Sequence, residues 1–527
     1  MTADREGPGG QPPSRVPVPV PVPTAVTVAV AGAGGFVGRR LVPHLVGLGH
    51  PVRALVRDPG ATEQRPGVEL RRVDVSDTDA LAEGLQGCAA AFYLVHAMAG
   101  GPGFADRDRD LALSFAEAAA RAGVERIVYL GGLGHGSLSE HLASRQEVGR
   151  LLGSHGVDVV EFRAAVVLGA GSISFEMIRY LTERLPMMVC PRWVNTRVQP
   201  IALGDLLEYL GQSLAVEPGV YEIGCPDVTT YREMMDAYAR VRGLRRRLIV
   251  KVPVLSPSLS AHWVDLVTPV DQTVSHSLIE SLTNEVTVQD AAHTDRAFTV
   301  RPLDVETAIR SALDEQADTL AGSLFERHGG LEDGVYTDRS SAPVRATGIG
   351  AGGEVAGVEA DLDDCGGTLA WYGWPNAWRL RIALGHPFGE DLRLSRPERV
   401  EAGAEVDWWR VETRESQTLV LSSRQWFCGE AWLGFRVSST TPTRIEQVGS
   451  LRTKGLVGLA YWWLLFPIHQ IAFRAMVHHR VVRARRMAAP RGGAAARARA
   501  KTGAKAGAKA GLKGGERGAA ARSAHHA

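Results

Sequence analysis

Between residues 25 and 165, short apolar runs alternate with longer segments in which apolar residues recur every three or four positions. The short runs have the length of buried strands, and the longer segments have the period of amphipathic helices. Strands and helices in alternation predict a doubly wound parallel sheet of the α/β class. The expected strands are 26–31, 51–56, 68–73, 89–95, 126–130 and 157–162, and the expected helices are 36–48, 104–122 and 140–155.

Glycines mark the junction between the first expected strand and the first expected helix. They fall at Gly32, Gly35 and Gly38, in a G-x-x-G-x-x-G spacing. Glycine lets a diphosphate approach the backbone, and a helix that begins at Phe36 and Val37 presents its N–H groups and positive dipole end to that diphosphate. An apolar strand before the glycines and an amphipathic helix after them favour dinucleotide binding over a plain tight turn.

The residues that follow the second and third strands predict which dinucleotide binds. Arg57 follows the second strand, and an arginine there favours the 2′-phosphate of NADP, with help from Arg53; NAD is the alternative cofactor. Both arginines could instead be ordinary solvated side chains. Asp74 and Val75 follow the third strand and are expected to bracket the adenine.

Two further strand ends carry candidate residues for the nicotinamide side. A doubly wound sheet binds its ligand at the carboxyl ends of its strands. His96 follows the fourth expected strand, and Gly131 follows the fifth. His96 either contacts the nicotinamide side or merely caps its strand.

Four motifs make residues 26–300 resemble the atypical short-chain dehydrogenase/reductase superfamily, in its NmrA-like and complex-I-39-kDa-subunit-like branch. They are Gly32-x-x-Gly35-x-x-Gly38, Arg53-Ala-Leu-Val-Arg57-Asp-Pro, Tyr93-Leu-Val-His96 and Gln199-Pro-Ile-Ala-Leu-Gly-Asp205. The resemblance implies that the first motif holds the diphosphate and the second the adenosine. It also implies that the third, with Val95 and His96, lies beside the nicotinamide ribose, and that the fourth closes the far side of the cleft.

The sequence departs from this superfamily at its catalytic helix. Active members carry Tyr-x-x-x-Lys, in which tyrosinate passes the proton and lysine lowers the pKa of the tyrosine. Here the corresponding helix reads His141-Leu-Ala-Ser-Arg145. His141 and Arg145 lie one turn apart on one face, so His141 could act as the acid with Arg145 as its orienting neighbour, because imidazole titrates near neutrality. The alternative is that the site has lost its chemistry.

Two functions follow from these residues. Phe175, Met177, Tyr180 and Trp193 lie in segments that could face the cleft and would make it apolar, although core packing explains each of them equally well. The first function is an NADP(H)-binding reductase-like protein acting on an apolar or quinone-like small molecule. The second is a non-catalytic nucleotide-sensing or complex-assembly protein.

The pattern changes after residue 328. Residues 329–360 are rich in Gly, Ala, Ser and Thr, which predicts a linker. Strands expected at 404–413, 417–425, 430–437 and 444–448 form an antiparallel meander, and a long helix follows at 455–480. These features resemble the uncharacterised DUF2867 domain, which is distantly similar to the START/Bet v 1 helix-grip fold. The Trp-rich stretch 371–378 would line the pocket of such a fold or fill its core.

The expected terminal helix is apolar enough to raise the question of a membrane. Residues 455–473 meet the length rule for a span, but spanning would send the nucleotide-binding body outside without a signal peptide, and Pro467 interrupts the run. We expect packing on the meander first, contact of 455–527 with the surface of an anionic membrane second, and a span third. The face expected to pack comprises Leu456, Leu459, Trp463, Phe466 and Gln470, and Trp462 and Leu465 extend its apolar surface around the helix.

Composition and charge limit the remaining choices. The chain is 45% hydrophobic and 22% charged, as expected for a soluble protein. Residues 480–527 carry a net charge of +12 and the whole chain +1, which leaves the first 479 residues at −11. The basic tail offers phosphate attraction but no specific nucleic-acid recognition. Five scattered cysteines without C-x-x-C argue against disulfides and a metal site, and fit a cytoplasmic protein.

The sequence thus predicts a doubly wound Rossmann sheet with a small substrate lobe, followed by an α+β domain with a helix-grip-like antiparallel sheet. The predicted divisions are a disordered leader (1–24), an NAD(P)-binding Rossmann domain (25–227), a substrate lobe and connector (228–328), a linker (329–360), a DUF2867-like domain (361–480) and a disordered basic tail (481–527).

Overall fold

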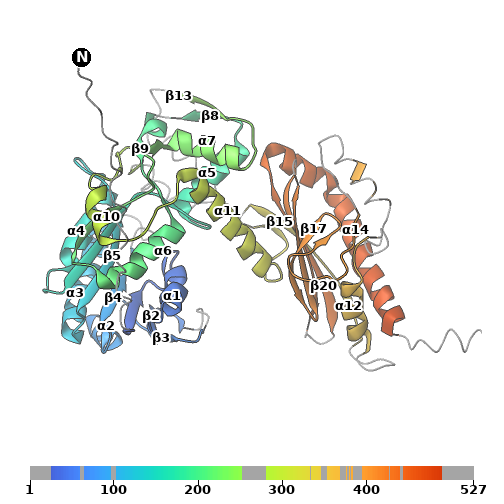
Figure 1. The fold of residues 1–527 in the computed structure, drawn as a ribbon, viewed down its shortest axis with the longest axis horizontal. Coiled ribbons are helices and arrows are strands. Elements are labelled where there is room, and N and C mark those ends of the chain that lie inside the picture. Colours follow the sequence, from blue (N-terminus) through green and yellow to red (C-terminus); the bar gives the residue numbers. More distant parts are fainter. Residues whose placement is uncertain are drawn as a thin grey trace, which may run out of the picture. The chain divides into compact units, whose positions relative to one another are not determined.

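The chain divides into two compact units, Met1–Gln316 and Ala317–Ala527 (Figure 1). The computed structural model describes residues 25–59, 64–96, 103–190, 192–251, 281–332, 334–345, 353–367, 376, 379, 382–383, 394–425, 428–438 and 443–488. The predicted leader, the tail beyond residue 488 and the tryptophans of the 371–378 stretch lie outside the described residues.

A seven-stranded parallel sheet forms the centre of the first unit, in the order β11-β6-β5-β4-β1-β2-β3. From β1 the chain runs outward to β3, then returns to β4 beside β1 and runs outward the other way. This is the doubly wound order that the sequence predicts. The strands are β1 Val28–Ala31, β2 Val52–Val56, β3 Val68–Arg72, β4 Ala90–Tyr93, β5 Arg126–Gly132, β6 Asp158–Ala164 and β11 Gly219–Ile223.

Helices cover both faces of this sheet through their apolar stripes. Leu81 of α2, Phe115 of α3 and Leu152 of α4 are fully buried on one face. Leu41 of α1 and Leu206 of α6 are fully buried on the other. These helices are α1 Gly38–Gly47, α2 Thr78–Leu85, α3 Phe104–Ala122, α4 Glu140–Leu152 and α6 Leu203–Gln212, and the shorter η4 Ser213–Ala215 and α10 Ala291–Ala297 accompany them.

A separate apolar cluster holds together a smaller lobe of the same unit. Its helices are α5 Ile173–Arg184, η3 Arg192–Asn195, α7 Tyr231–Val241 and α11 Val305–Gly322, and its short strands are β7 Val167–Leu168, β8 Met187–Cys190, β9 Arg197–Val198, β10 Ile201–Ala202, β12 Thr229–Thr230 and β13 Leu248–Lys251. Because α5 and η3 precede β11, the lobe and the main sheet interleave along the chain rather than meeting at the predicted boundary near residue 228.

The second unit contains a seven-stranded antiparallel sheet in the order β14-β15-β20-β19-β18-β17-β16. Its strands are β14 Gly330–Glu332, β15 Val335–Pro343, β16 Glu405–Val406, β17 Trp409–Glu415, β18 Thr418–Gln425, β19 Gly429–Ser438 and β20 Arg444–Thr453, and its helices are α12 Gly353–Asp363 and α14 Gly455–Ala488. The α+β class, the meander and the long terminal helix are therefore confirmed.

The predicted linker 329–360 is wrong, because β14, β15 and α12 occupy most of it. Strand β15 pairs with β20 along its whole length, and its Thr337 hydroxyl lies 2.9 Å from that of Ser450. A Cβ atom on Gly357 would overlap the backbone of Ala484 in α14. The small residues therefore serve close packing of strand and helix, which a composition-based interpretation mistakes for a linker.

Helix α14 packs on the sheet differently from the prediction. Its second half is buried through Met476, Val477, Val481 and Ala484. In its first half Trp462 is 4% exposed, whereas Trp463, which was expected to be buried, is 62% exposed. Leu459 and Phe466 pack beside Trp462, and Gln470 donates to Asp338 of β15 at 2.7 Å, so the predicted face is right for these three residues. It is wrong for Leu456 and Trp463, which are exposed.

A buried ion pair anchors α14 to α12. The guanidinium of Arg480, fully buried, donates to Asp361 at 2.7 Å, and Arg483 lies 2.6 Å from the same carboxylate. We expect Asp361→Asn to lower the free energy of unfolding of the second unit by about 3–5 kcal/mol, because it leaves a buried arginine charge without its counterion. Denaturant unfolding measures this, with Asp363→Asn as the control. The Asp363 side chain is 65% exposed in its pair with Arg414, so its carboxylate stays in water and its loss should cost about 1 kcal/mol or less.

Candidate functional site

The glycine turn after β1 has the geometry that diphosphate binding requires. Gly32 has φ +83°, and a Cβ atom there would lie 2.7 Å from the carbonyl oxygen of Leu94, so a side chain is excluded. The turn is closed by the Gly35 N–H, which donates to the Gly32 carbonyl at 2.9 Å. A Cβ atom on Gly38 would overlap the backbone of Gly32, so only glycine lets α1 lie this close. Val37, the N-cap residue, has no polar side chain to compete for the helix N-terminus.

The far wall of the turn comes from the loop after β7. The ring of Phe36 would lie 3.3 Å from a Cβ atom on Gly169. Arg40 of α1 donates to the Ala170 carbonyl and pairs with Glu315 of α11, both at 2.5 Å. These contacts hold the start of α1 against the lobe.

The predicted adenosine-side residues lie at adjacent strand ends. Arg57 follows β2 and is exposed, and Asp74 follows the neighbouring β3. Hydrogen bonds from Ser76, with the charge of Arg57 as a lesser cause, lower the pKa of Asp74 from its ordinary value. Val75 is half-buried against the core.

Arg53 does not assist Arg57. Its guanidinium pairs with Glu69 at 2.8 Å and donates to the carbonyls of Gly84 and Gln86. These contacts tie it to the sheet edge and to the end of α2. The predicted help from Arg53 in holding a 2′-phosphate is therefore wrong.

Two histidines and an aspartate meet beyond β4. His96 Nδ1 lies 2.8 Å from Asp108 Oδ2, and Asp108 is 2% exposed on α3. The His141 ring lies 5.1 Å from the His96 ring, centroid to centroid. His96 therefore does more than cap β4, because its ring contacts Asp108 of α3 and lies close to His141 of α4. Val95, beside it, is half-buried against the core.

Arg145 is held next to these histidines by β5. Its guanidinium donates to the Leu130 carbonyl and lies over the Tyr129 ring, 5.5 Å from the centroid. The Tyr129 hydroxyl donates in turn to the Arg145 carbonyl at 2.9 Å. Arginine stays protonated in proteins, so this arrangement fixes a positive charge beside His141.

His141 is neutral at physiological pH, which corrects the expectation that it titrates near neutrality. Burial, followed by the charges of His96 and Arg145, lowers the pKa of His141 from 6.5 to about 3. Burial also lowers the pKa of His96, against the raising effect of Asp108. Of the described atoms, none forms a hydrogen bond with the buried Nε2 of His96 or Nδ1 of His141. Buried polar atoms normally have hydrogen-bond partners, so these two nitrogen atoms fit a site in which a bound ligand supplies the partners.

The lowered pKa of His141 predicts a pH dependence of stability. The unfolded chain protonates this imidazole below about 6.5, while the folded chain does not until about 3, so stability is lost as the pH falls between these values. At pH 5 we expect the first unit to be about 2 kcal/mol less stable than at pH 7 from this residue alone. Denaturant unfolding at both pH values measures the loss, and His141→Gln should remove most of it. An equal pH effect in the variant would contradict the assigned pKa.

An apolar cavity of about 170 Å³ opens beside His141 and Arg145. Met177 and Trp193 line it, whereas Phe175 and Tyr180, which were also expected to face the cleft, are buried in the lobe. The other lining residues are Gly131, Gly132, Leu133, Leu142, Ala164, Ala165, Val166, Ser174, Ile178, Leu181, Tyr231, Met235, Ser281, Leu282 and Val286. The cavity lies between the ends of β5 and β6 and the lobe.

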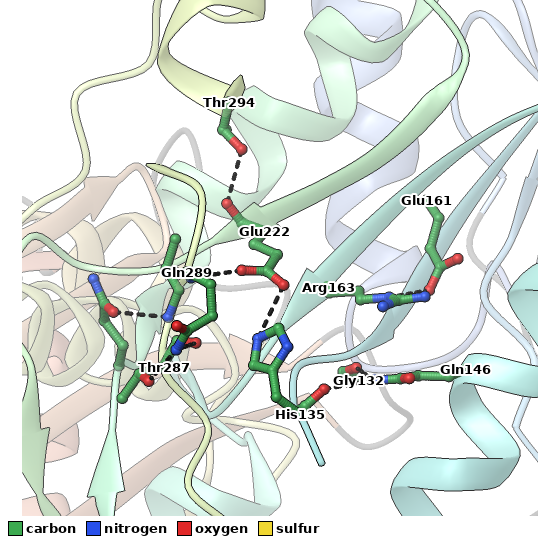
Figure 2. A network of polar contacts seen from close by, with 12 residues as sticks. Gly132, His135, Gln146, Glu161, Arg163, Glu222, Thr287, Gln289 and Thr294 are labelled. Atoms are coloured by element: carbon green, nitrogen blue, oxygen red, sulfur yellow. Dashed lines mark hydrogen bonds and ion pairs between the residues drawn. The ribbon is translucent and has the colours of Figure 1, made fainter. Parts of the chain in front are cut away.

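A polar network, drawn in Figure 2, holds the loop after β5. Leu133 of this loop lines the cavity. His135 Nε2 lies 3.0 Å from Glu222 of β11, which also accepts from the Gln289 N–H at 2.7 Å. On the other side, the Gln146 amide donates to the Gly134 carbonyl at 2.9 Å. The loop after β5 is thereby tied to β11 and to α4.

The sequence reasoning missed Asp108 and Glu161. Asp108 shares its helix face with the buried Ala112 and Phe115, four and seven residues later, which is the signal that could have identified it. Glu161 is buried beside Arg163, and burial raises its pKa. A Cβ atom on Gly131 would lie 2.9 Å from the Glu161 carboxylate, so Gly131 makes room for that side chain.

Comparisons with known proteins agree with this geometry. Residues 32–156 match the NAD(P)H-binding family model, and residues 333–476 match the model of DUF2867, a protein family of unknown function. The 3 beta-hydroxysteroid dehydrogenase/Delta 5-->4-isomerase of Mycobacterium tuberculosis (strain ATCC 25618 / H37Rv) is 34% identical over 105 residues. That match spans 18% of this chain and only 28% of the relative.

Two solved structures are similar to about half of this chain. The Bordetella bronchiseptica enzyme WbmG in complex with NAD has 18% identity and a TM-score of 0.44, over 56% of this chain and 96% of that one. The Citrobacter sp. triphenylmethane reductase has 19% identity and a TM-score of 0.44, over 55% of this chain and 99% of that one. The glycine turn and the doubly wound parallel sheet agree with the NAD(P)H-binding match of residues 32–156, so this chain joins an NAD(P)H-binding domain to a region that matches DUF2867.

Proposed function

We propose that this NAD(P)H-dependent oxidoreductase-like protein reduces a small apolar carbonyl compound or quinone bound in the cavity beside His141 and Arg145. The observation that carries the proposal is an apolar cavity with a neutral imidazole and a fixed guanidinium on its wall. A cavity of about 150 Å³ lined by aliphatic side chains can hold a benzene ring. The present cavity therefore suits a compact single ring rather than a charged sugar nucleotide.

The residues present fit an NAD(P) cofactor. Glycine at positions 32, 35 and 38 allows the tight turn after β1 and the close approach of α1, which together present the backbone at the start of α1 to a diphosphate. When bound, the cofactor would supply a hydride, that is, both electrons of the reduction. The buried nitrogen atoms of His96 and His141 would then face the nicotinamide side of the site.

The side chains of the cavity wall would stabilise the charge that develops on the substrate. Neutral His141 would donate an N–H hydrogen bond to the substrate oxygen, as a neutral imidazole can act as an electrophile. Arg145 would add a fixed positive charge near that oxygen in a site largely shielded from water. Solvent would supply the proton that completes the reduction. Asp108 would act as a positioning residue, since its bond to His96 Nδ1 fixes the tautomer of that ring.

A screen of NADPH oxidation tests the proposal. The full chain is incubated with NADPH and with single-ring quinones, small apolar aldehydes and ketones, and a nucleoside-diphosphate sugar as the polar comparison. We expect loss of the nicotinamide absorbance with the apolar compounds only. Oxidation by the sugar nucleotide alone would contradict the proposed substrate class.

A non-catalytic nucleotide sensor is the second candidate, favoured by one observation. Helix α4 carries His141 and Arg145 where active relatives carry the Tyr-x-x-x-Lys tyrosine and lysine. Tight NADPH binding without oxidation by any compound of the screen would favour this function over the reductase.

The choice between NADP and NAD depends on Arg57. We expect Arg57→Asp to weaken NADPH binding by roughly 30-fold or more, because a charge-assisted contact to the 2′-phosphate is replaced by repulsion. NADH, which lacks that phosphate, should bind nearly as before. Calorimetric titration with both cofactors measures this, with Arg150→Asp on the exposed surface of α4 as the matched control. Equal losses for both cofactors would remove Arg57 from the site.

A further inference from the structure

Helix α14 has an apolar first half that the described residues of the second unit cover on one side only. By length and composition alone, Gly455–Met487 is the one helix among the described residues that could cross a membrane. Only 17% of its most apolar 18-residue window is buried. Five large side chains of this half are exposed, namely Leu456 (51%), Val457 (60%), Trp463 (62%), Leu464 (77%) and Ile471 (62%). An exposed apolar surface of this kind marks an interaction site on a soluble protein.

These five residues form one continuous surface, here called the apolar stripe. Leu456 and Trp463 are seven residues apart, as are Val457, Leu464 and Ile471, so each set lies on one face of the helix. The two sets adjoin, and the exposed Ala460 and Pro467 fill the space between them. The stripe is about 22 Å long at 1.5 Å per residue.

The opposite side of the same half is occupied by the sheet. Trp462 stacks on Tyr336 of β15 with 5.2 Å between ring centroids. A Cβ atom on Gly458 would overlap the carbonyl of Cys428, so the helix backbone packs directly against the backbone just before β19. Further along, the Arg480–Asp361 and Arg483–Asp364 pairs fix the second half. An upright span would break these contacts, whereas a helix lying flat would keep all of them.

The charges of this segment select the kind of surface that the stripe fits. Helix α14 contains five arginines and no Asp or Glu, and Arg474 and Arg486 are exposed. The sequence after it, residues 489–527, adds nine Lys and Arg against one Glu. Basic residues next to an apolar face with an exposed tryptophan are typical of helices that lie in the interface of anionic membranes.

We propose that the apolar stripe of α14 lies in the headgroup region of an anionic membrane, with the helix axis parallel to the membrane plane. The sheet stays on the water side, and the basic residues that follow the stripe bind anionic lipid headgroups. This role is independent of the reductase proposal, because it uses no residue of the first unit.

Flotation of the full chain with lipid vesicles tests this inference. We expect binding to vesicles that contain phosphatidylglycerol, little binding to pure phosphatidylcholine, and release by high salt. The double variant Trp463→Glu/Leu464→Glu should bind roughly 100-fold more weakly, because both side chains would leave water on binding. Met187→Glu, at an equally exposed apolar position in the first unit (59%), is the matched control and should bind like the unchanged chain.

Three results would overturn the inference. The first is equal vesicle binding by the Trp463→Glu/Leu464→Glu variant, checked by circular dichroism to be folded. The second is chain that stays in the vesicles through a high-salt and carbonate wash, which would mean that α14 spans the bilayer. The third is the absence of vesicle binding together with a dimer that this variant dissociates, which would assign the stripe to a second copy of the chain.

Discussion

Replacement of Gly35 by glutamate should abolish NADPH binding and leave the protein folded. A Cβ atom on Gly35 would meet only the Gly32 carbonyl, at 3.1 Å, so the turn can accommodate it with a small adjustment. The carboxylate that follows would occupy the position of the diphosphate and repel it at the N-terminus of α1. We expect the dissociation constant, measured by calorimetry, to rise by roughly 1,000-fold or beyond detection.

Gly47→Glu is the matched control for this variant. Gly47 ends the same helix, and a Cβ atom there would meet nothing within 4 Å. The control adds the same charge at the far end of α1, so its NADPH affinity should stay close to that of the unchanged chain. A folded Gly35→Glu protein that binds NADPH normally would remove the glycine turn from the cofactor site.

Replacement of His141 by alanine should lower turnover by about 100-fold with NADPH affinity unchanged. The reason is the loss of the hydrogen-bond donor on the cavity wall, an effect in the range of single acid–base groups. The substrate for this assay is the most active compound of the NADPH oxidation screen. Because the pKa of His141 is about 3, the rate of the unchanged enzyme should show no inflection from this group near pH 6.5.

His155→Ala provides the comparison, since His155 is exposed just beyond the end of α4. It should leave turnover unchanged. If His141→Ala also turns over normally at every pH, His141 is no part of the mechanism, and the cavity wall would have to act through Arg145 alone.

The pattern of the sequence predicts the first unit well because its central strands β1 and β4 are buried along their whole length. A run such as Val28–Ala31 has no polar residue to face solvent, so it fits only a strand that is covered on both faces. The glycines that follow it indicate a tight turn, because side chains there would overlap the backbone. The second unit was harder. Gly357 makes a close helix–helix contact that composition presents as a linker, and neighbouring Trp462 and Trp463 have opposite exposures that an apolar run cannot distinguish.

The candidate site could be predicted only in part, because its chemistry depends on contacts between distant residues. The positions of His141 and Arg145 follow from their place on the helix after the fifth strand. The pKa of His141, in contrast, depends on burial and on His96, which lies 45 residues earlier in the chain and meets it only in the fold. Helical spacing marks Asp108 as buried, but its pairing with His96 follows only from the fold, in which α3 places the two side chains together.

A structure of the full chain in complex with NADP⁺ tests the central claim most directly. We expect the diphosphate to lie on the Gly32–Gly38 turn at the start of α1, and the nicotinamide C4 atom to face the cavity beside His141 and Arg145. A nicotinamide ring turned away from that cavity, or a diphosphate bound elsewhere, would contradict it.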